Sequence, residues 1–155
     1  MNINIPIEEQ KINAIRWLNA LLSGDYKQDQ GRLGNSENGF CCWGVGCIVT
    51  NISFEPDTTW DKTLYEYIGF NTMLGTVHPK ISNYGSLDSF NDDLKLSFKE
   101  IAAYLIKYSN SNFSPEISVH IDEYYENNEE VQELIKNLIT KYAIDEVFEE
   151  EELCG

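Results

Sequence analysis

Basic residues are scarce in this sequence. The 155 residues include 11 Lys and Arg against 26 Asp and Glu, which gives a formal net charge of −15. A surface this acidic repels nucleic acid and anionic membranes, so we expect direct binding to neither. It can attract a basic partner, including a protein surface that otherwise holds DNA or RNA, but a solvated face that serves solubility is the more common role of such a surface.

Long apolar runs are absent as well. No stretch approaches the roughly 20 apolar residues that a membrane-spanning helix needs. The first residues, 1–9, lack the basic region and apolar core of a secretion signal. We therefore expect a cytoplasmic protein.

Histidine and cysteine are too few, and wrongly spaced, for a metal site. The chain has two histidines, His78 and His120, and its cysteines are Cys41, Cys42, Cys47 and Cys154. A structural zinc site needs paired ligands such as C-x2-C, repeated or matched with histidines. The sequence predicts no metal and no cofactor, and it favours reduced cysteines that act as small hydrophobic side chains.

The stretch 39–49 is the most unusual part of the chain, because it concentrates cysteine, glycine and tryptophan. We predict a helix from Cys42 to about Asn51 that is buried on nearly all sides. Glycines at 44 and 46 cost about 1 kcal/mol each in a helix interior, which is tolerable where another backbone approaches closely. The residues expected to be packed inside are Trp43, Val45, Cys47, Ile48 and Val49.

Hydrophobic periodicity and capping signals predict a mainly helical α+β fold in a single domain, with Gly24 as the left-handed cap of the first helix and with Ser97 and Glu100 as a capping box. Further helices are expected at 6–23, 61–68, 97–107 and 128–142, with another starting near 114. A short β-hairpin turns at 35–39, and a short strand is expected at 76–78. The apolar face of the first helix is expected to comprise Ile12, Ala14, Ile15, Trp17, Leu18, Leu21 and Leu22.

The sequence contains no interdomain linker, but its negative charge is concentrated in the C-terminal part. We predict a core at 1–110 and, packed on the same domain, an acidic C-terminal helical extension at 111–155. From residue 116 onward there are 13 acids against two lysines, a net charge of −11. Residues 149–152 are expected to fray. The candidate partner-binding residues are Glu123, Glu126, Glu129, Glu130 and Glu133.

A polar segment, residues 26–32, precedes the central helix and is a candidate ligand site. It combines an aromatic ring, amide groups and two cations, which suit a phosphate-bearing nucleotide. An exposed hairpin edge protected by charge is the structural alternative. The candidate ligand-binding residues are Tyr26, Lys27, Gln28, Gln30 and Arg32, together with Asn91 and Asp92.

A cysteine-dependent hydrolase or transferase is the alternative of another class. Cys41 or Cys42 opens a helix, whose dipole lowers a thiol pKa, and Gln28 or Gln30 lies upstream as an oxyanion donor. Such an enzyme also needs a base within hydrogen-bond reach, and only His78 or His120 could serve.

The chain resembles a family of small bacteriophage and prophage proteins over about residues 10–107. Their pattern is Ser-Gly-x-Tyr-x-Gln, Gly-x-Leu, Gly-Phe-Cys-Cys-Leu-Gly-Val-x-Cys, then Leu-Asn-Asp and Ser-Phe-x-x-Ile-Ala. Trp43 and Phe90 replace two of its leucines. The matching residues are Ser23, Gly24, Tyr26, Gln28, Gly31, Leu33, Gly39, Phe40, Cys41, Cys42, Gly44, Val45, Cys47, Asn91, Asp92, Ser97, Phe98, Ile101 and Ala102.

The resemblance implies a virus-associated accessory protein in the host cytoplasm. We therefore expect a non-enzymatic protein that acts by binding and counters a host defence. Either its acidic surface imitates nucleic acid on a basic host protein, or the polar segment sequesters a small nucleotide. The sequence leaves the oligomeric state open.

Overall fold

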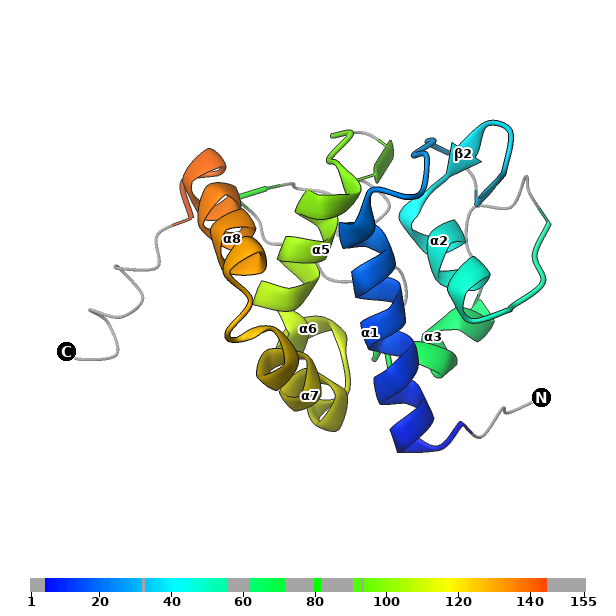
Figure 1. Ribbon diagram of the computed structural model, residues 1–155, viewed down its shortest axis with the longest axis horizontal. Helices are drawn as coiled ribbons and strands as arrows, with labels where there is room; N and C mark the ends of the chain where they lie inside the picture. Colours follow the sequence, from blue (N-terminus) through cyan, green and yellow to red (C-terminus); the bar gives the residue numbers. More distant parts are fainter. Residues whose placement is uncertain are drawn as a thin grey trace.

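The computed structural model describes residues 5–31, 33–55, 62–71, 80–81, 91–92 and 94–144. It confirms the mainly helical α+β fold, and Figure 1 shows α1 in the centre of the molecule. The strands β1 (Gly34–Asn35) and β2 (Gly39–Phe40) form the antiparallel hairpin. The helices are α1 (Ile7–Ser23), α2 (Cys42–Val49), α3 (Lys62–Ile68), α5 (Phe98–Lys107), α6 (Ser109–Asn112), α7 (Pro115–Tyr125) and α8 (Glu129–Lys141).

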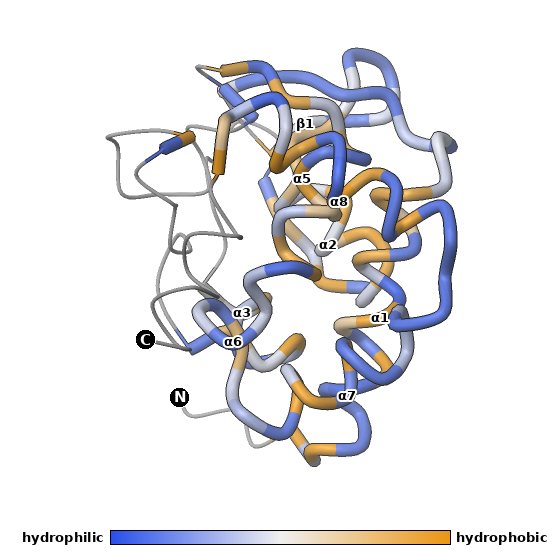
Figure 2. The backbone as a smooth tube through the Cα atoms, turned by 90° about the vertical axis from the view of Figure 1, so that its left-hand side faces the viewer, coloured by the Kyte–Doolittle hydropathy of each residue, from blue (hydrophilic) through white to orange (hydrophobic). Residues whose placement is uncertain are grey.

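Helix α1 is the centre of the fold because it packs against α2, α3, α5 and α7. Gly24 ends it in the left-handed conformation with φ 79°, as predicted. Ile12 of the expected apolar face is 53% exposed, and Leu22 is only partly buried although it packs against the core. Figure 2 shows the resulting alternation of hydrophilic and hydrophobic positions along α1. The buried stripe is therefore narrower than the run of apolar residues in the sequence.

Helix α2 is the buried helix predicted from the Gly- and Cys-rich stretch. Residues Cys42 to Cys47 are all buried, whereas Ile48, expected inside, is 40% exposed. A Cβ atom on Gly44 would collide with the backbone carbonyl oxygen of Leu33, so the expected close approach of another backbone is present. At Gly46 the neighbours are side chains, because a Cβ atom there would lie 2.7 Å from Leu64 Cδ2.

Two tryptophans join α1 to α2. The Trp17 and Trp43 rings stack with centroids 5.2 Å apart and planes 15° apart. The Trp17 indole also donates a 2.8 Å hydrogen bond from Nε1 to the carbonyl oxygen of Cys42. Aromatic stacking and a satisfied indole N–H together stabilise a buried contact, and they hold the start of α2 against the middle of α1.

The C-terminal helices pack on α1 and α5 and form part of the main core. Ile117 and Ile121 of α7 are fully buried, α8 packs against α5, and Val131 and Leu138 of α8 lie in the core. Residues 109–112 form α6, so the boundary expected near residue 110 falls inside a helix. The predicted strand at 76–78 and the tail at 149–152 lie outside the described residues.

A capping box begins α5, and an ion pair joins this end of α5 to the end of α8. Ser97 and Glu100 form the predicted capping box, and Lys141 Nζ donates to Glu100 Oε2 at 2.8 Å. Burial acts to raise the pKa of Glu100, but the hydrogen bonds from Lys141 and the Ser97 backbone bring it below its ordinary value. The same hydrogen bond raises the pKa of Lys141. The pair is therefore charged throughout the neutral range.

Replacing Lys141 with methionine should lower the free energy of unfolding by about 0.5 kcal/mol at pH 7, because the pair is mostly exposed. A carboxyl group with a lowered folded-state pKa stabilises the fold above its unfolded pKa, and that stability is lost as the pH falls through the folded-state value. In urea unfolding, the difference between wild type and variant should therefore shrink as the pH falls below the ordinary pKa of glutamate, and it should vanish once Glu100 is protonated in the folded state. Lys136→Met, on the exposed face of the same helix, is the control and should have no such pH-dependent effect.

Candidate functional site

The predicted ligand residues Gln28, Asn91 and Asp92 come together, but they bond to one another. Gln28 Nε2 donates to Asn91 Oδ1 at 2.9 Å and to the Leu96 carbonyl oxygen at 2.7 Å. Asn91 Nδ2 donates to the Asp29 carbonyl oxygen at 2.8 Å and to Asp92 Oδ1 at 2.9 Å. Asp92 Oδ1 also accepts from the Gly31 backbone N–H at 2.7 Å. This network braces the segment 28–31.

This hydrogen-bond network of Gln28, Asn91 and Asp92, called the brace from here on, holds the polar segment beside the hairpin. Asn91 is only 1% exposed, and its amide oxygen and nitrogen both have partners within the protein. The Phe40 backbone N–H donates to the Lys27 carbonyl oxygen, and the Asp29 backbone N–H donates to the Phe40 carbonyl oxygen, each at 2.8 Å. The side-chain amides of Gln28 and Asn91, which were predicted to hold a ligand, are engaged in hydrogen bonds that position backbone.

The remaining predicted ligand residues do not converge on Asn91 through any hydrogen bond described for this part of the chain. Tyr26 is half-buried and packs edge-on against Phe40 with ring centroids 6.4 Å apart. Lys27 is exposed and Gln30 is half-buried. Arg32 lies outside the described residues.

The candidate catalytic cysteines are buried. Cys41 is 5% exposed, and Cys42 and Cys47 are fully buried in the core. His120 lies on α7, beside the Tyr124 ring, while α2 and α7 lie on opposite sides of α1 in Figure 1. His78 lies outside the described residues. A catalytic thiol must meet both substrate and base, and the burial of these side chains weighs against that role.

All five predicted partner-binding glutamates are exposed. Glu123 lies on α7, Glu126 follows it, and Glu129, Glu130 and Glu133 lie on α8. We call these five residues the acidic face. Because α7 and α8 are joined by only a short turn, their charges lie close together although they come from two helices.

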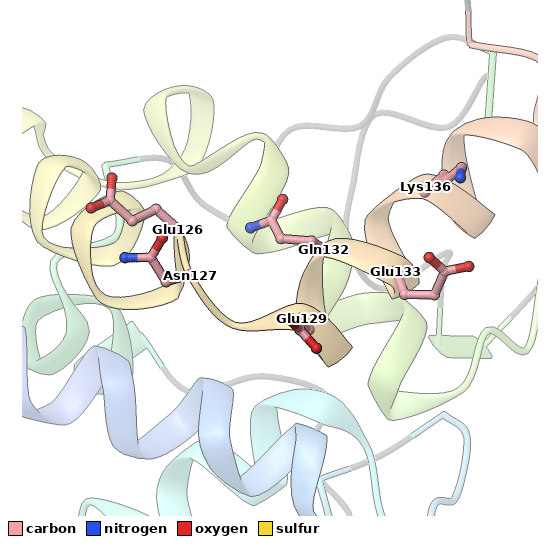
Figure 3. A pocket seen from close by; sticks show the side chains of 6 residues that line it. All are labelled: Glu126, Asn127, Glu129, Gln132, Glu133 and Lys136. Carbon is pink, nitrogen blue, oxygen red and sulfur yellow. The ribbon is translucent and has the colours of Figure 1, made fainter.

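An open groove of about 590 Å³ runs along part of the acidic face (Figure 3). Three of the five glutamates line it, together with polar residues that the sequence analysis did not single out. The spacing of residues 129, 132, 133 and 136 on one side of α8 is the signal that indicates them. The lining residues are Glu126, Asn127, Glu129, Gln132, Glu133 and Lys136.

The groove carries more negative than positive charge. Within the described part of the chain, Glu126, Glu129 and Glu133 have no ion pair, whereas Glu130 pairs with Lys99 at 3.5 Å. Figure 3 shows Lys136 at the α8 end of the groove, next to Glu133. The result is a negatively charged concave surface open to solvent.

Other kinds of site have little support among the described residues. No group of three or more His, Cys, Asp or Glu side chains there is placed to hold a metal ion. No helix in the same residues is long and apolar enough to cross a bilayer.

The fold and this surface define a small helical α+β protein with an exposed acidic face on α7 and α8. The chain belongs to a family described as a domain of unknown function, DUF8296, which matches residues 9–139. No curated protein and no solved structure matches the chain. The family match continues past residue 107 through α7 and most of α8, so the helices that carry the acidic face belong to the family's own domain.

Proposed function

We propose that this protein acts by binding, through the acidic face, a basic surface of another protein. The main support for this proposal is the set of three exposed glutamates without ion pairs around one groove. Charges that are not paired within the molecule remain available to a partner. A partner surface that otherwise holds nucleic acid phosphates offers the matching array of Lys and Arg side chains.

The resemblance to phage and prophage proteins supplies the biological setting of the proposal. In that setting the protein is an accessory factor in the cytoplasm of an infected cell, and it occupies the nucleic-acid-binding surface of a host defence protein. The internal hydrogen bonds of Gln28 and Asn91 favour the acidic face over a nucleotide site. The burial of Cys41 and Cys42 favours binding over cysteine catalysis.

Neutralising the groove should weaken binding to a basic probe. We expect the triple variant Glu126→Gln, Glu129→Gln, Glu133→Gln to bind a fluorescent decalysine peptide about tenfold more weakly at low salt. Each exposed ion pair contributes about 0.5 kcal/mol, and tenfold corresponds to about 1.4 kcal/mol. Fluorescence anisotropy at increasing NaCl measures the effect, and wild-type affinity should fall steeply with salt.

The matched control removes the same three charges elsewhere. Glu9, Asp25 and Glu37 are exposed and lie on α1, after α1 and in the hairpin turn. The variant Glu9→Gln, Asp25→Asn, Glu37→Gln should change the affinity by less than about twofold, since its charges lie away from the groove. Equal losses in the two triple variants would mean that only net charge matters and that the acidic face serves solubility.

The nature of the natural partner can be tested by capture from bacterial extract. Wild-type protein should retain a protein that duplex DNA displaces, and the groove variant should not retain it. A captured protein that DNA fails to displace would contradict occupation of a nucleic-acid-binding surface.

A further inference from the structure

A second recess of about 230 Å³, which we call the hollow, adjoins the groove between α5, α7 and α8 (Figure 1). It shares two of its lining residues, Glu126 and Gln132, with the groove of the acidic face. The groove is lined by polar residues, whereas the hollow also has three buried apolar residues of the core in its wall, Ile106, Tyr125 and Ile135. The hollow is therefore a partly apolar recess beside a charged surface.

The carboxyl group of Asp122 lines the hollow and is held by a buried hydrogen bond. Ser109 Oγ donates to Asp122 Oδ1 at 3.0 Å, and Ser109 is only 1% exposed. Because a hydroxyl group has one proton, Ser118 Oγ must in turn donate to Ser109 Oγ, 2.8 Å away. Within the described residues Asp122 Oδ2 accepts no hydrogen bond, and Asp122 is exposed. This oxygen is therefore available to a group that enters the hollow.

The other polar groups of the hollow are mostly acceptors. Gln132 Nε2 donates to the Tyr125 carbonyl oxygen at 3.0 Å, which leaves the side-chain oxygen of Gln132 as an acceptor. Glu126 adds a second carboxylate, and it has no ion pair within the described part of the chain. Among the lining residues Lys107 alone is cationic. Two carboxylates and an amide oxygen against one ammonium group favour an occupant with N–H donors and a positive charge.

We propose that the hollow binds the side chain of an arginine from the basic partner, an inference that rests on the proposed function of the acidic face. A guanidinium group has five N–H donors in a planar fork, no acceptor, and the geometry to pair with carboxylates such as Asp122 and Glu126. Its aliphatic stem suits the apolar wall at Ile106 and Ile135. Lysine has the same charge but a compact ammonium group, so the hollow favours arginine, whereas the open groove accepts either residue.

Two peptides of equal charge test the proposal: fluorescent heptalysine, and the same peptide with arginine as its central residue. In fluorescence anisotropy at low salt, wild type should bind the arginine peptide about fivefold more tightly. Asp122→Asn should reduce this preference to below about twofold, because it removes the charge but keeps an oxygen that can accept from Ser109. A third peptide has citrulline, the uncharged isostere of arginine, at its centre and should bind more weakly than heptalysine.

Two control variants separate the hollow from net charge and from the groove. Glu116→Gln removes one exposed charge from α7 at a position that does not line the hollow, and it should leave the arginine preference unchanged. The double variant Glu129→Gln, Glu133→Gln changes residues that line the groove but not the hollow. It should weaken the binding of both charged peptides to the same extent and keep the preference for arginine.

Three results would overturn the arginine site. They are a wild-type preference below about twofold, a preference that survives Asp122→Asn, and a citrulline peptide that binds as tightly as the arginine peptide. In each case, salt-sensitive binding of heptalysine that the double groove variant weakens would still support the acidic face, so the two proposals can fail separately. If wild type binds neither heptalysine nor the arginine peptide, both proposals are wrong.

Discussion

Replacing Gly44 with alanine is expected to destabilise the protein by about 3 kcal/mol. In an ordinary helix interior the same change would stabilise it by about 1 kcal/mol, since alanine is the better helix former. Here the added Cβ atom would collide with the Leu33 carbonyl oxygen. That oxygen also accepts a 3.2 Å hydrogen bond from the Cys41 backbone N–H, so moving it away breaks a second contact. Urea unfolding followed by far-UV circular dichroism measures the change.

The sign of the Gly44→Ala effect decides between two arrangements. If α2 did not pack directly on the segment before the hairpin, the substitution would be neutral or stabilising, and that outcome would contradict the close contact. Gly46→Ala should cost less, because its nearest neighbour is the flexible end of the Leu64 side chain. Ile48→Ala, at a 40% exposed position of the same helix, is the control and should cost less than about 1 kcal/mol.

Replacing Asn91 with alanine should also destabilise the protein strongly, by about 3 kcal/mol. The change removes one acceptor of Gln28, which keeps its hydrogen bond to the Leu96 carbonyl oxygen, and it removes the Asn91 donor from the Asp29 carbonyl oxygen and from Asp92 Oδ1. Polar groups left buried without partners cost about 1–3 kcal/mol each. Asn91→Asp should be destabilising too, since it removes both donated hydrogen bonds and adds a negative charge beside Asp92. Thermal or urea unfolding provides the measurement.

The Asn91 result also separates the two interpretations of the polar segment. A residue held for a ligand would tolerate alanine with little change in stability and would instead lose stabilisation by nucleotide. A loss below about 0.5 kcal/mol would therefore contradict the bracing role. Lys27→Ala is the matched control within the same segment: Lys27 is exposed, so its removal should leave stability unchanged.

The helices could be predicted from the sequence because their signals are local. Ser97 and Glu100 form a capping box that both the sequence and the structure contain. Gly24 ends α1 as predicted, and Asn128 caps α8 by accepting a 3.0 Å hydrogen bond from the Val131 backbone N–H. Such signals depend on residues three or four positions apart, so no knowledge of the tertiary structure is needed.

Most of the wrong predictions concern which side of a helix is covered by another element of the fold. Ile12 and Ile48 satisfy helical periodicity, yet no described element of the chain covers them enough to bury them. Periodicity identifies an apolar stripe, but its width depends on how many helices pack around it. The short helix α6 was missed because four polar residues, Ser109 to Asn112, give no apolar period.

The two candidate sites also differ in whether their residues lie close together in the sequence. The acidic face is predictable because its glutamates crowd one stretch of sequence, and helical spacing places several on one side of α8. The brace is not predictable, since Gln28 and Asn91 are 63 positions apart. Glutamine, asparagine and aspartate grouped in a sequence suit a ligand site and a structural network equally well. The two roles can be distinguished only from the group to which each side-chain amide is hydrogen-bonded in the structure.

The stacked indoles of Trp17 and Trp43 make the packing of the core detectable by spectroscopy. Two of the three tryptophans are fixed in one rigid geometry, with centroids 5.2 Å apart. Near-ultraviolet circular dichroism depends on such fixed packing, whereas the far-ultraviolet signal reports helix content alone. A state in which the helices persist but α2 has separated from α1 would lose the first signal and keep the second. Loosening of the core can therefore be observed without any added label.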